Sequence, residues 1–239
     1  GKTGTKSMAD QMAGGSLMSA DSSTFTSTRV SMLTGKTDQN AAPSSFHEIM
    51  PSADGKKNVG KVISDNYEVV EGSWPKNKNE VVLVLDENNS LSLTAVYELG
   101  LKSASEYHDM MNQLNSGDDV KTDTKKIDYS DVIDRTLKLL PACDQYVKGD
   151  NGHWTYVGDD VDQINALIDS DKAIDLKIVG VVKPVEDADA TPLSSGVGYT
   201  RALTNELIDR AESSEIVTEQ QSDKDHNVLN GMTFSPSDD

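Results

Sequence analysis

Several residue types that carry out chemistry in proteins occur in this chain, and the first pattern to test is a histidine beside a carboxylate. Zinc-dependent hydrolases place two histidines four positions apart on a helix, with a glutamate as general base. His47-Glu48 begins such a pattern, but the chain continues as Ile49-Met50-Pro51. Proline stands where the second histidine belongs, and it would break the helix. The sequence therefore predicts no zinc site here.

Two further patterns of reactive residues are incomplete. Residues 35–37 match the end of a phosphate-binding loop, but Val30 stands where the first glycine of G-x-x-x-x-G-K-[ST] is needed. The serines within residues 14–18 and 194–196 each lack one of the two glycines of a nucleophile elbow. We expect neither an ATP site nor a serine hydrolase.

Cysteines and acidic clusters add no metal site to the prediction. Cys143 is the only cysteine, so neither an internal disulfide nor a cysteine cage for zinc is expected. The acidic stretches 86–89 and 159–162 have the residue types of calcium ligands without the EF-hand order, and we interpret them as solvated loops rather than a weak ion site. With 40 acidic residues, no carboxylate pair can be singled out for glycoside chemistry. We predict no catalytic residue, no cofactor and no metal.

Four residues are candidates for contact with a partner molecule. Gly196-Val-Gly-Tyr-Thr is interpreted as a loop in which Gly196 and Gly198 let the backbone approach another molecule, with Tyr199 beside them. The alternative, which we favour, is a plain connection into a helix at 204–211. Trp154 lies in a polar stretch with several glycines and is predicted to be a contact residue. Trp74, by contrast, is predicted to pack over the turn before a buried strand.

The elements that must position these residues follow from hydrophobic patterning. Residues 80–86 and 176–182 are continuous apolar runs rich in β-branched residues, which is typical of strands buried on both faces. Helices are expected at 92–99, 103–115, 161–169 and 204–211, the last capped by Thr200 or Thr204. Weaker patterns indicate strands at 67–70, 129–140, 145–147 and 215–218, a loop at 183–198, and a partly helical stretch within 1–45. Strands and helices alternate without strict order, so the predicted fold class is α+β, with mixed α/β character.

Charge and hydropathy narrow the classes of partner. The chain has 239 residues and a formal net charge of −18, so a nucleic-acid backbone or an anionic membrane surface would be repelled. The longest apolar runs, 81–85 and 178–182, are far shorter than the roughly 18 residues that a membrane helix needs. We predict an acidic, globular body that does not bind nucleic acid.

Four sequence segments within residues 60–239 are informative through their order and spacing. They are NYEVVEGSWPKNKNEVVLVLD at 66–86, YELGL at 97–101, KIVGVVKP at 177–184 with GVGYT at 196–200, and SEIV at 214–217 followed by Gln220, Val228, Gly231 and Phe234. Together they resemble the extracellular region of FtsX-like (MacB-type) ABC transporter permeases from Gram-positive bacteria. Members of that family carry similar Y-x-x-x-x-G-x-W-P-x-x-x-N-E-V-V-L-V-x-D and L-Y-x-L-G-L stretches. Residues 1–45 match the family poorly.

The resemblance implies a two-lobed domain on the extracellular side of the cell membrane. Residues 1–86 and 175–239 would form a membrane-proximal, porter-like lobe, and residues 87–174 would form an inserted lobe. The chain starts Gly-Lys-Thr-Gly, and we interpret it as a piece of a longer protein. One transmembrane helix is expected before Gly1 and three are expected after Asp239.

The resemblance also implies partners and a function. The partners would be a cytoplasmic ATP-binding subunit, or a fused ATP-binding domain, and a second copy of the permease. The domain would couple ATP hydrolysis to export or extraction of a peptide, lipoprotein or antimicrobial compound. The alternatives are a stand-alone cell-surface binding module, such as an adhesin or solute receptor, and a hydrolase with an unrecognised site.

Overall fold

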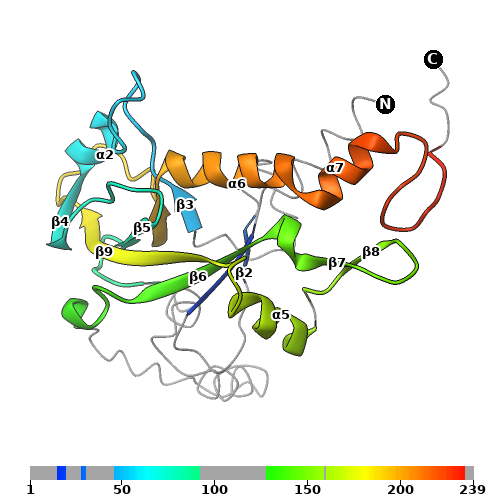
Figure 1. Ribbon diagram of the computed structural model, residues 1–239. Coiled ribbons are helices and arrows are strands. Elements are labelled where there is room, and N and C mark those ends of the chain that lie inside the picture. Colours follow the sequence, from blue (N-terminus) through cyan, green and yellow to red (C-terminus); the bar gives the residue numbers. More distant parts are fainter. Residues whose placement is uncertain (1–14, 20–27, 31–45, 92–127, 159, 235–239) are drawn as a thin grey trace, which may run out of the picture.

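The protein has a mixed α/β fold, as the sequence predicts, and its described residues form one main sheet, a small hairpin and four helices (Figure 1). The computed structural model describes residues 15–19, 28–30, 46–91, 128–158 and 160–234. The two-lobe division stays a prediction. A strand at 136–141, from the range expected to be the inserted lobe, belongs to the main sheet.

The main sheet has six core strands, and two short N-terminal strands extend one of its edges. In chain order its strands are β1 (Gly15–Ser19), β2 (Thr28–Val30), β3 (Phe46–Glu48), β4 (Tyr67–Gly72), β5 (Glu80–Val84), β6 (Thr136–Pro141), β9 (Ile174–Pro184) and β10 (Gly196–Tyr199). The spatial order is β2-β1-β6-β9-β5-β10-β3, and β4 pairs with the C-terminal half of β9. The strands β7 (Tyr146–Lys148) and β8 (Trp154–Tyr156) form a separate hairpin.

The centre of the sheet is the parallel pair of β5 and β9, the two strands that the sequence predicts most clearly. Val81 lies opposite Ile178 and Val84 lies opposite Val182. Side chains on both faces of β5 are fully buried, because helices and loops cover the sheet on each side. A continuous β-branched run is typical of such a doubly covered strand, so this prediction is confirmed.

The helices are short except for one. They are α2 (Lys61–Asn66), α5 (Val161–Ile168), α6 (Arg201–Ser213) and α7 (Glu215–Ser222), with 3₁₀ turns at Tyr129–Asp131 and Ala142–Gln145. The predicted helices at 161–169 and 204–211 are confirmed as α5 and α6, and Thr200 is the N-cap residue of α6. Asp160 caps α5 by accepting hydrogen bonds from the first-turn amides.

Each face of the sheet has its own apolar core. Leu203 and Leu207 of α6 pack on Val81, Leu83 and Val197. On the opposite face, Ile63 of α2 belongs to a second cluster that also holds Ile49, Tyr67, Val82, Val84, Val182 and Leu193. Trp74 is half-buried against this second cluster, which confirms its predicted packing role.

One local prediction is wrong, one holds only for the C-terminal part of its range, and one is confirmed to within one residue. Residues 215–218 belong to the helix α7, because Ser214 caps its first turn and residues 216, 217 and 220 bury one helical face. The strand expected at 129–140 begins only at Thr136, after a 3₁₀ turn and a positive φ at Asp134. The strand expected at 145–147 is β7, which begins at Tyr146 after a second 3₁₀ turn.

The glycine-rich stretch and the N-terminal region also differ from expectation. Residues 196–199 form the strand β10 rather than a loop, since β10 pairs with β5 on one side and β3 on the other. The chain is extended at 15–19 and 28–30, where a partly helical stretch was expected. The helices predicted at 92–99 and 103–115 lie outside the described residues.

Candidate functional site

Three of the four predicted contact residues lie inside the sheet. Gly196, Gly198 and Tyr199 are buried in β10, and Tyr199 is only 4% exposed. A Cβ at Gly198 would meet the side chains of Ile49 and Val82 at 3.1–3.2 Å. The glycine therefore serves close packing against the neighbouring strands, and the described structure gives these three residues little surface for a partner to touch.

Tyr199 is the start of a polar network at the edge of the sheet. Its ring stacks on Phe46 of β3, with centroids 4.3 Å apart and an interplanar angle of 22°. Burial raises the pKa of the Tyr199 phenol, and the nearby Glu48 carboxylate raises it further. The phenol therefore stays protonated across the physiological range, as a structural group does.

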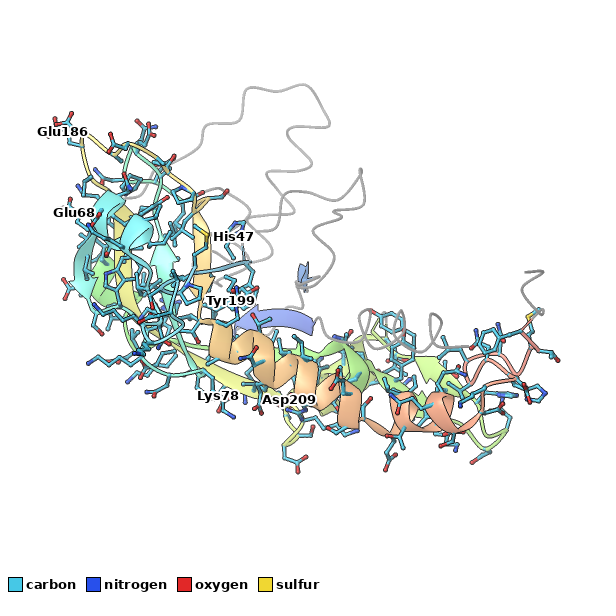
Figure 2. The ribbon with its side chains drawn as sticks, turned by 90° about the horizontal axis from the view of Figure 1, so that it is seen from above. His47, Glu68, Lys78, Glu186, Tyr199 and Asp209 are labelled. Carbon is cyan, nitrogen blue, oxygen red and sulfur yellow. The ribbon has the colours of Figure 1, made fainter. Side chains whose placement is uncertain are left out.

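Glu48 links the edge strand β3 to the first turn of α6. Its two carboxylate oxygens accept hydrogen bonds from Arg201 Nε and Thr204 Oγ1. Thr204 also hydrogen-bonds with the Tyr199 side chain. The network thus ties β3, β10 and α6 together, around the position where Figure 2 shows Tyr199 at the start of the helix.

His47 lies on the opposite face of β3 from this network, as strand alternation requires. Burial lowers the pKa of its imidazole, so the ring is neutral at neutral pH. Its Nε2 is buried and has no hydrogen-bond partner among the described residues.

Trp154, the fourth predicted contact residue, is buried where the hairpin meets α7. The ring is 8% exposed and packs with Cys143, Ile216, Val217 and Val228, among others. Its indole Nε1 donates to Glu219 Oε2 at 2.8 Å. Lys148 Nζ also contacts this carboxylate oxygen at 2.8 Å and lies 5.9 Å from the centre of the indole ring. Trp154 is thus a docking residue between two elements of the same chain, and its contact with a partner stays a prediction.

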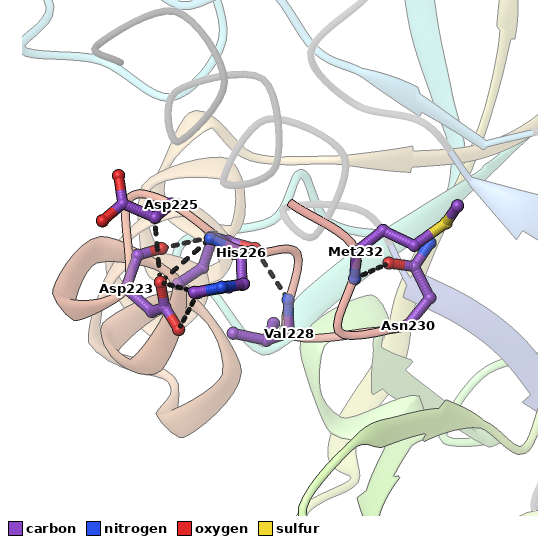
Figure 3. A network of polar contacts seen from close by, with 7 residues as sticks. Asp223, Asp225, His226, Val228, Asn230 and Met232 are labelled. Atoms are coloured by element: carbon purple, nitrogen blue, oxygen red, sulfur yellow. Dashed lines mark hydrogen bonds and ion pairs between the residues drawn. The ribbon is translucent and has the colours of Figure 1, made fainter. Parts of the chain in front are cut away.

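A second polar network holds the loop that follows α7 (Figure 3). Gln220 Nε2 donates to the carbonyl oxygens of Asp223 and His226, and Gln220 Oε1 accepts from the Val228 amide. The Asp223 carboxylate accepts from the backbone amides of Asp225 and His226 and lies 3.1 Å from His226 Nδ1. The hydrogen bond from the His226 amide, followed by that from its side chain, lowers the pKa of Asp223.

Protonating Asp223 should release the amides that it holds. The pKa of Asp223 in the folded protein lies below the ordinary value of 3.8. The ionised carboxylate therefore stabilises the folded protein above that value, and this stabilisation is lost as pH falls through the folded pKa. We expect the NMR amide shifts of Asp225 and His226 to titrate with a midpoint below 3.8. Asp223→Asn should abolish this titration and Asp225→Asn should preserve it. A midpoint above the ordinary value would contradict the network.

Cys143 belongs to the apolar cluster around Trp154 and lies beside a half-buried ion pair. Arg210 of α6 approaches Asp144 with Nε 3.0 Å from Oδ2. Burial raises the pKa of Asp144, and Arg210 opposes that increase. Burial, assisted by the Asp144 charge, raises the pKa of the Cys143 thiol to about 12. The thiol is therefore an inert core group.

The reactivity of Cys143 is a direct test of this packing. Because only the thiolate is alkylated, iodoacetamide at about pH 8 should modify the native protein at least about 100-fold more slowly than the urea-unfolded chain. The chain has no other cysteine, so the measured rate belongs to Cys143 alone. Equal rates for the native and unfolded chains would show that the 143–154 region is open in solution.

The polar networks around Glu48 and Asp223 consist of hydrogen bonds and ion pairs that join elements of the fold. Within the described ranges, no group of three or more His, Cys, Asp or Glu residues is arranged to hold a metal ion. In the same part of the chain, none of the helices has the length and apolar character that crossing a bilayer requires. The network of Glu48, Arg201 and Thr204 was not predicted, and no sequence signal indicates it, because Arg201 lies 153 positions from Glu48.

Comparisons with known proteins give no assignment. No family model, no curated protein and no solved structure matches this chain.

Proposed function

We propose that this chain is the extracellular domain of an ABC transporter permease of the FtsX-like (MacB-type) class. In this role it would couple ATP hydrolysis in the cytoplasm to export or extraction of a peptide, lipoprotein or antimicrobial compound at the cell surface. It would work with an ATP-binding subunit or fused domain and with a second copy of the permease. Binding and movement, rather than bond-making chemistry, would be its task.

The observation that carries the proposal is where the family-like segments lie in the fold. Segment 66–86 forms β4 and β5, segment 177–184 lies in β9, and segment 196–200 contains β10. These strands are neighbours in one sheet, although they are far apart in the sequence. The resemblance thus falls on one contiguous framework rather than on scattered surface positions, which favours a shared fold over chance similarity.

The molecule is also elongated. The 11-residue strand β9 and the successive helices α6 and α7 run along the long dimension of the molecule (Figure 1). The ion pair between Lys78 and Glu206, at 2.8 Å, adds a link between α6 and the turn before β5. An elongated arrangement of this kind supports a role in transmitting motion.

The first test is the topology of the parent protein. We expect the gene to encode one apolar span before Gly1 and three after Asp239. A signal peptide with a wall anchor, in place of paired spans, would defeat the proposal and favour a stand-alone adhesin or solute receptor. Turnover of a peptide, ester or glycoside by the purified domain, abolished by one substitution, would instead favour a hydrolase.

The second test is movement in the intact transporter. Spin labels on an Asp209→Cys variant would report the distance between two copies, because Cys143 is buried and should not react. Glu186→Cys is the companion position, because Glu186 lies at one end of the molecule and Asp209 lies near its middle (Figure 2). We expect the distances to differ between nucleotide-free and ATP-bound states, and to stay fixed when the ATP site is inactivated. Unchanged distances at both positions would contradict a coupling role.

A further inference from the structure

The strand β4 has one edge that no described strand covers. It pairs only with β9, and residues 68–72 are exposed. Val69 and Val70 are each 37% exposed. An open strand edge presents main-chain donors and acceptors that a further strand can pair with.

The hydrogen-bond pattern shows which groups of β4 face this edge. The Val185 amide donates to Asn66 O at 3.0 Å, so Asn66 and Val185 form a hydrogen-bonded pair. Hydrogen-bonded and non-hydrogen-bonded pairs alternate along an antiparallel ladder. Val69 and Val182 lie three pairs further along, so they form a non-hydrogen-bonded pair. Consistently, Val182 O accepts from Leu85 on the opposite side, toward β5. The amide and carbonyl of Val69 therefore point to the open edge.

A bulge in β4 brings two carboxylates to one face. Glu68 lies opposite Lys183 and Glu71 lies opposite Val181, with a register shift between Val69 and Glu71. Lys183 and Val181 are two positions apart on β9, so Glu68 and Glu71 project from the same face. Glu68 forms an ion pair with Lys183, with Oε1 3.2 Å from Nζ. No ion pair among the described residues involves Glu71.

The surroundings add negative charge. The loop after β9 begins opposite Tyr67 and carries three further exposed acids, Glu186, Asp187 and Asp189. Figure 2 shows Glu68 and Glu186 at the same end of the molecule. No ion pair of the described residues neutralises the three loop acids, so this end attracts cations.

We propose that the open edge of β4 binds an extended segment of a partner protein that carries two cationic side chains two residues apart. A regular strand would place such a pair opposite Glu68 and Glu71, while its main chain pairs with Val69. A second copy of this chain fits poorly, because antiparallel β4–β4 pairing would set Glu68 against Glu71. The proposal stands on this edge alone and does not depend on the permease assignment.

The test uses a fluorescein-labelled, acetylated and amidated peptide, Thr-Lys-Val-Lys-Val-Thr, with a twin in which both lysines are glutamates. Fluorescence anisotropy of the whole chain with each peptide should show saturable binding of the lysine peptide only. NMR should show the Val69 amide protected from exchange on binding. No saturation up to about 1 mM would overturn the proposal.

Three variants separate strand pairing from simple charge attraction. Val69→Pro removes the outward amide, is compatible with an edge strand, and should weaken binding at least about ten-fold. Glu71→Lys should weaken it about five-fold without touching the β9 ladder, and remains informative if the proline variant fails to fold. Asp209→Lys makes the same change of charge on α6 and should alter binding by less than about two-fold.

Two other outcomes would also overturn the proposal. If Asp209→Lys weakens binding as much as Glu71→Lys does and Val69→Pro has no effect, the peptide is held by net charge alone. If the chain instead forms dimers that Val69→Pro disrupts, the occupant of the edge is a second copy.

Discussion

Trp154→Ala is expected to lower the free energy of unfolding by about 3–5 kcal/mol. The indole fills the centre of the cluster between the hairpin, Cys143 and α7, and it is 8% exposed. Its removal leaves a cavity among Ile216, Val217 and Val228, and it also deprives Glu219 of the indole hydrogen bond. Urea unfolding followed by circular dichroism measures the change, and Trp74 remains as a fluorescent probe.

Trp154→Phe is the matched control, because it keeps most of the ring volume and removes only the N–H donor. Glu219 keeps Lys148 as a partner, so the loss should be limited to about 0.5–1.5 kcal/mol from the hydrogen bond, plus the smaller ring. An unchanged free energy of unfolding for Trp154→Ala would contradict the buried position. It would then favour the contact with a partner that the sequence suggests.

Gly72→Ala is expected to destabilise the protein by about 3 kcal/mol or more, because two penalties combine. Gly72 has a φ of +70°, which is costly for any residue with a Cβ. A Cβ there would also lie 2.1 Å from the carbonyl oxygen of Val179, so the backbone of β9 would have to move. Gly180, its partner in the register, is equally constrained, with a Cβ position 2.2 Å from Ser73 O.

Gly55→Ala separates the two penalties in Gly72→Ala. Gly55 has nearly the same φ, +69°, but nothing lies within 4 Å of its Cβ position. This variant should therefore cost only about 1 kcal/mol, the conformational penalty alone. If the two variants unfold at the same urea concentration, the close approach of β4 and β9 does not exist in solution.

Local sequence patterns were sufficient to predict the strands and helices whose environment is uniform along their length. β5 and β9 are continuous β-branched runs because both of their faces are covered. α5 and α6 repeat apolar residues at helical spacing because one face of each packs on the core. The mixed α/β class follows from such elements and is confirmed, whereas the two-lobe division stays a prediction.

Local patterns failed where neighbours distant in sequence decide the conformation. β10 contains two glycines and would be a loop by composition, but pairing with β5 and β3 makes it a strand. Residues 215–218 are rich in β-branched side chains, yet the cap at Ser214 and the burial of Ile216 and Val217 make them helical. Propensity is a weak preference that tertiary contacts override.

The sequence by itself determined the acidic balance, the mixed fold class, the two central strands and the lack of complete catalytic motifs, because these are properties of residues and their local spacing. Only the tertiary structure decided that Trp154 and Tyr199 are core residues, since burial depends on what folds over them. It also decided that Glu48 meets Arg201 and that Val69 faces an open edge. Such pairings arise from sheet order and register, which no local pattern encodes.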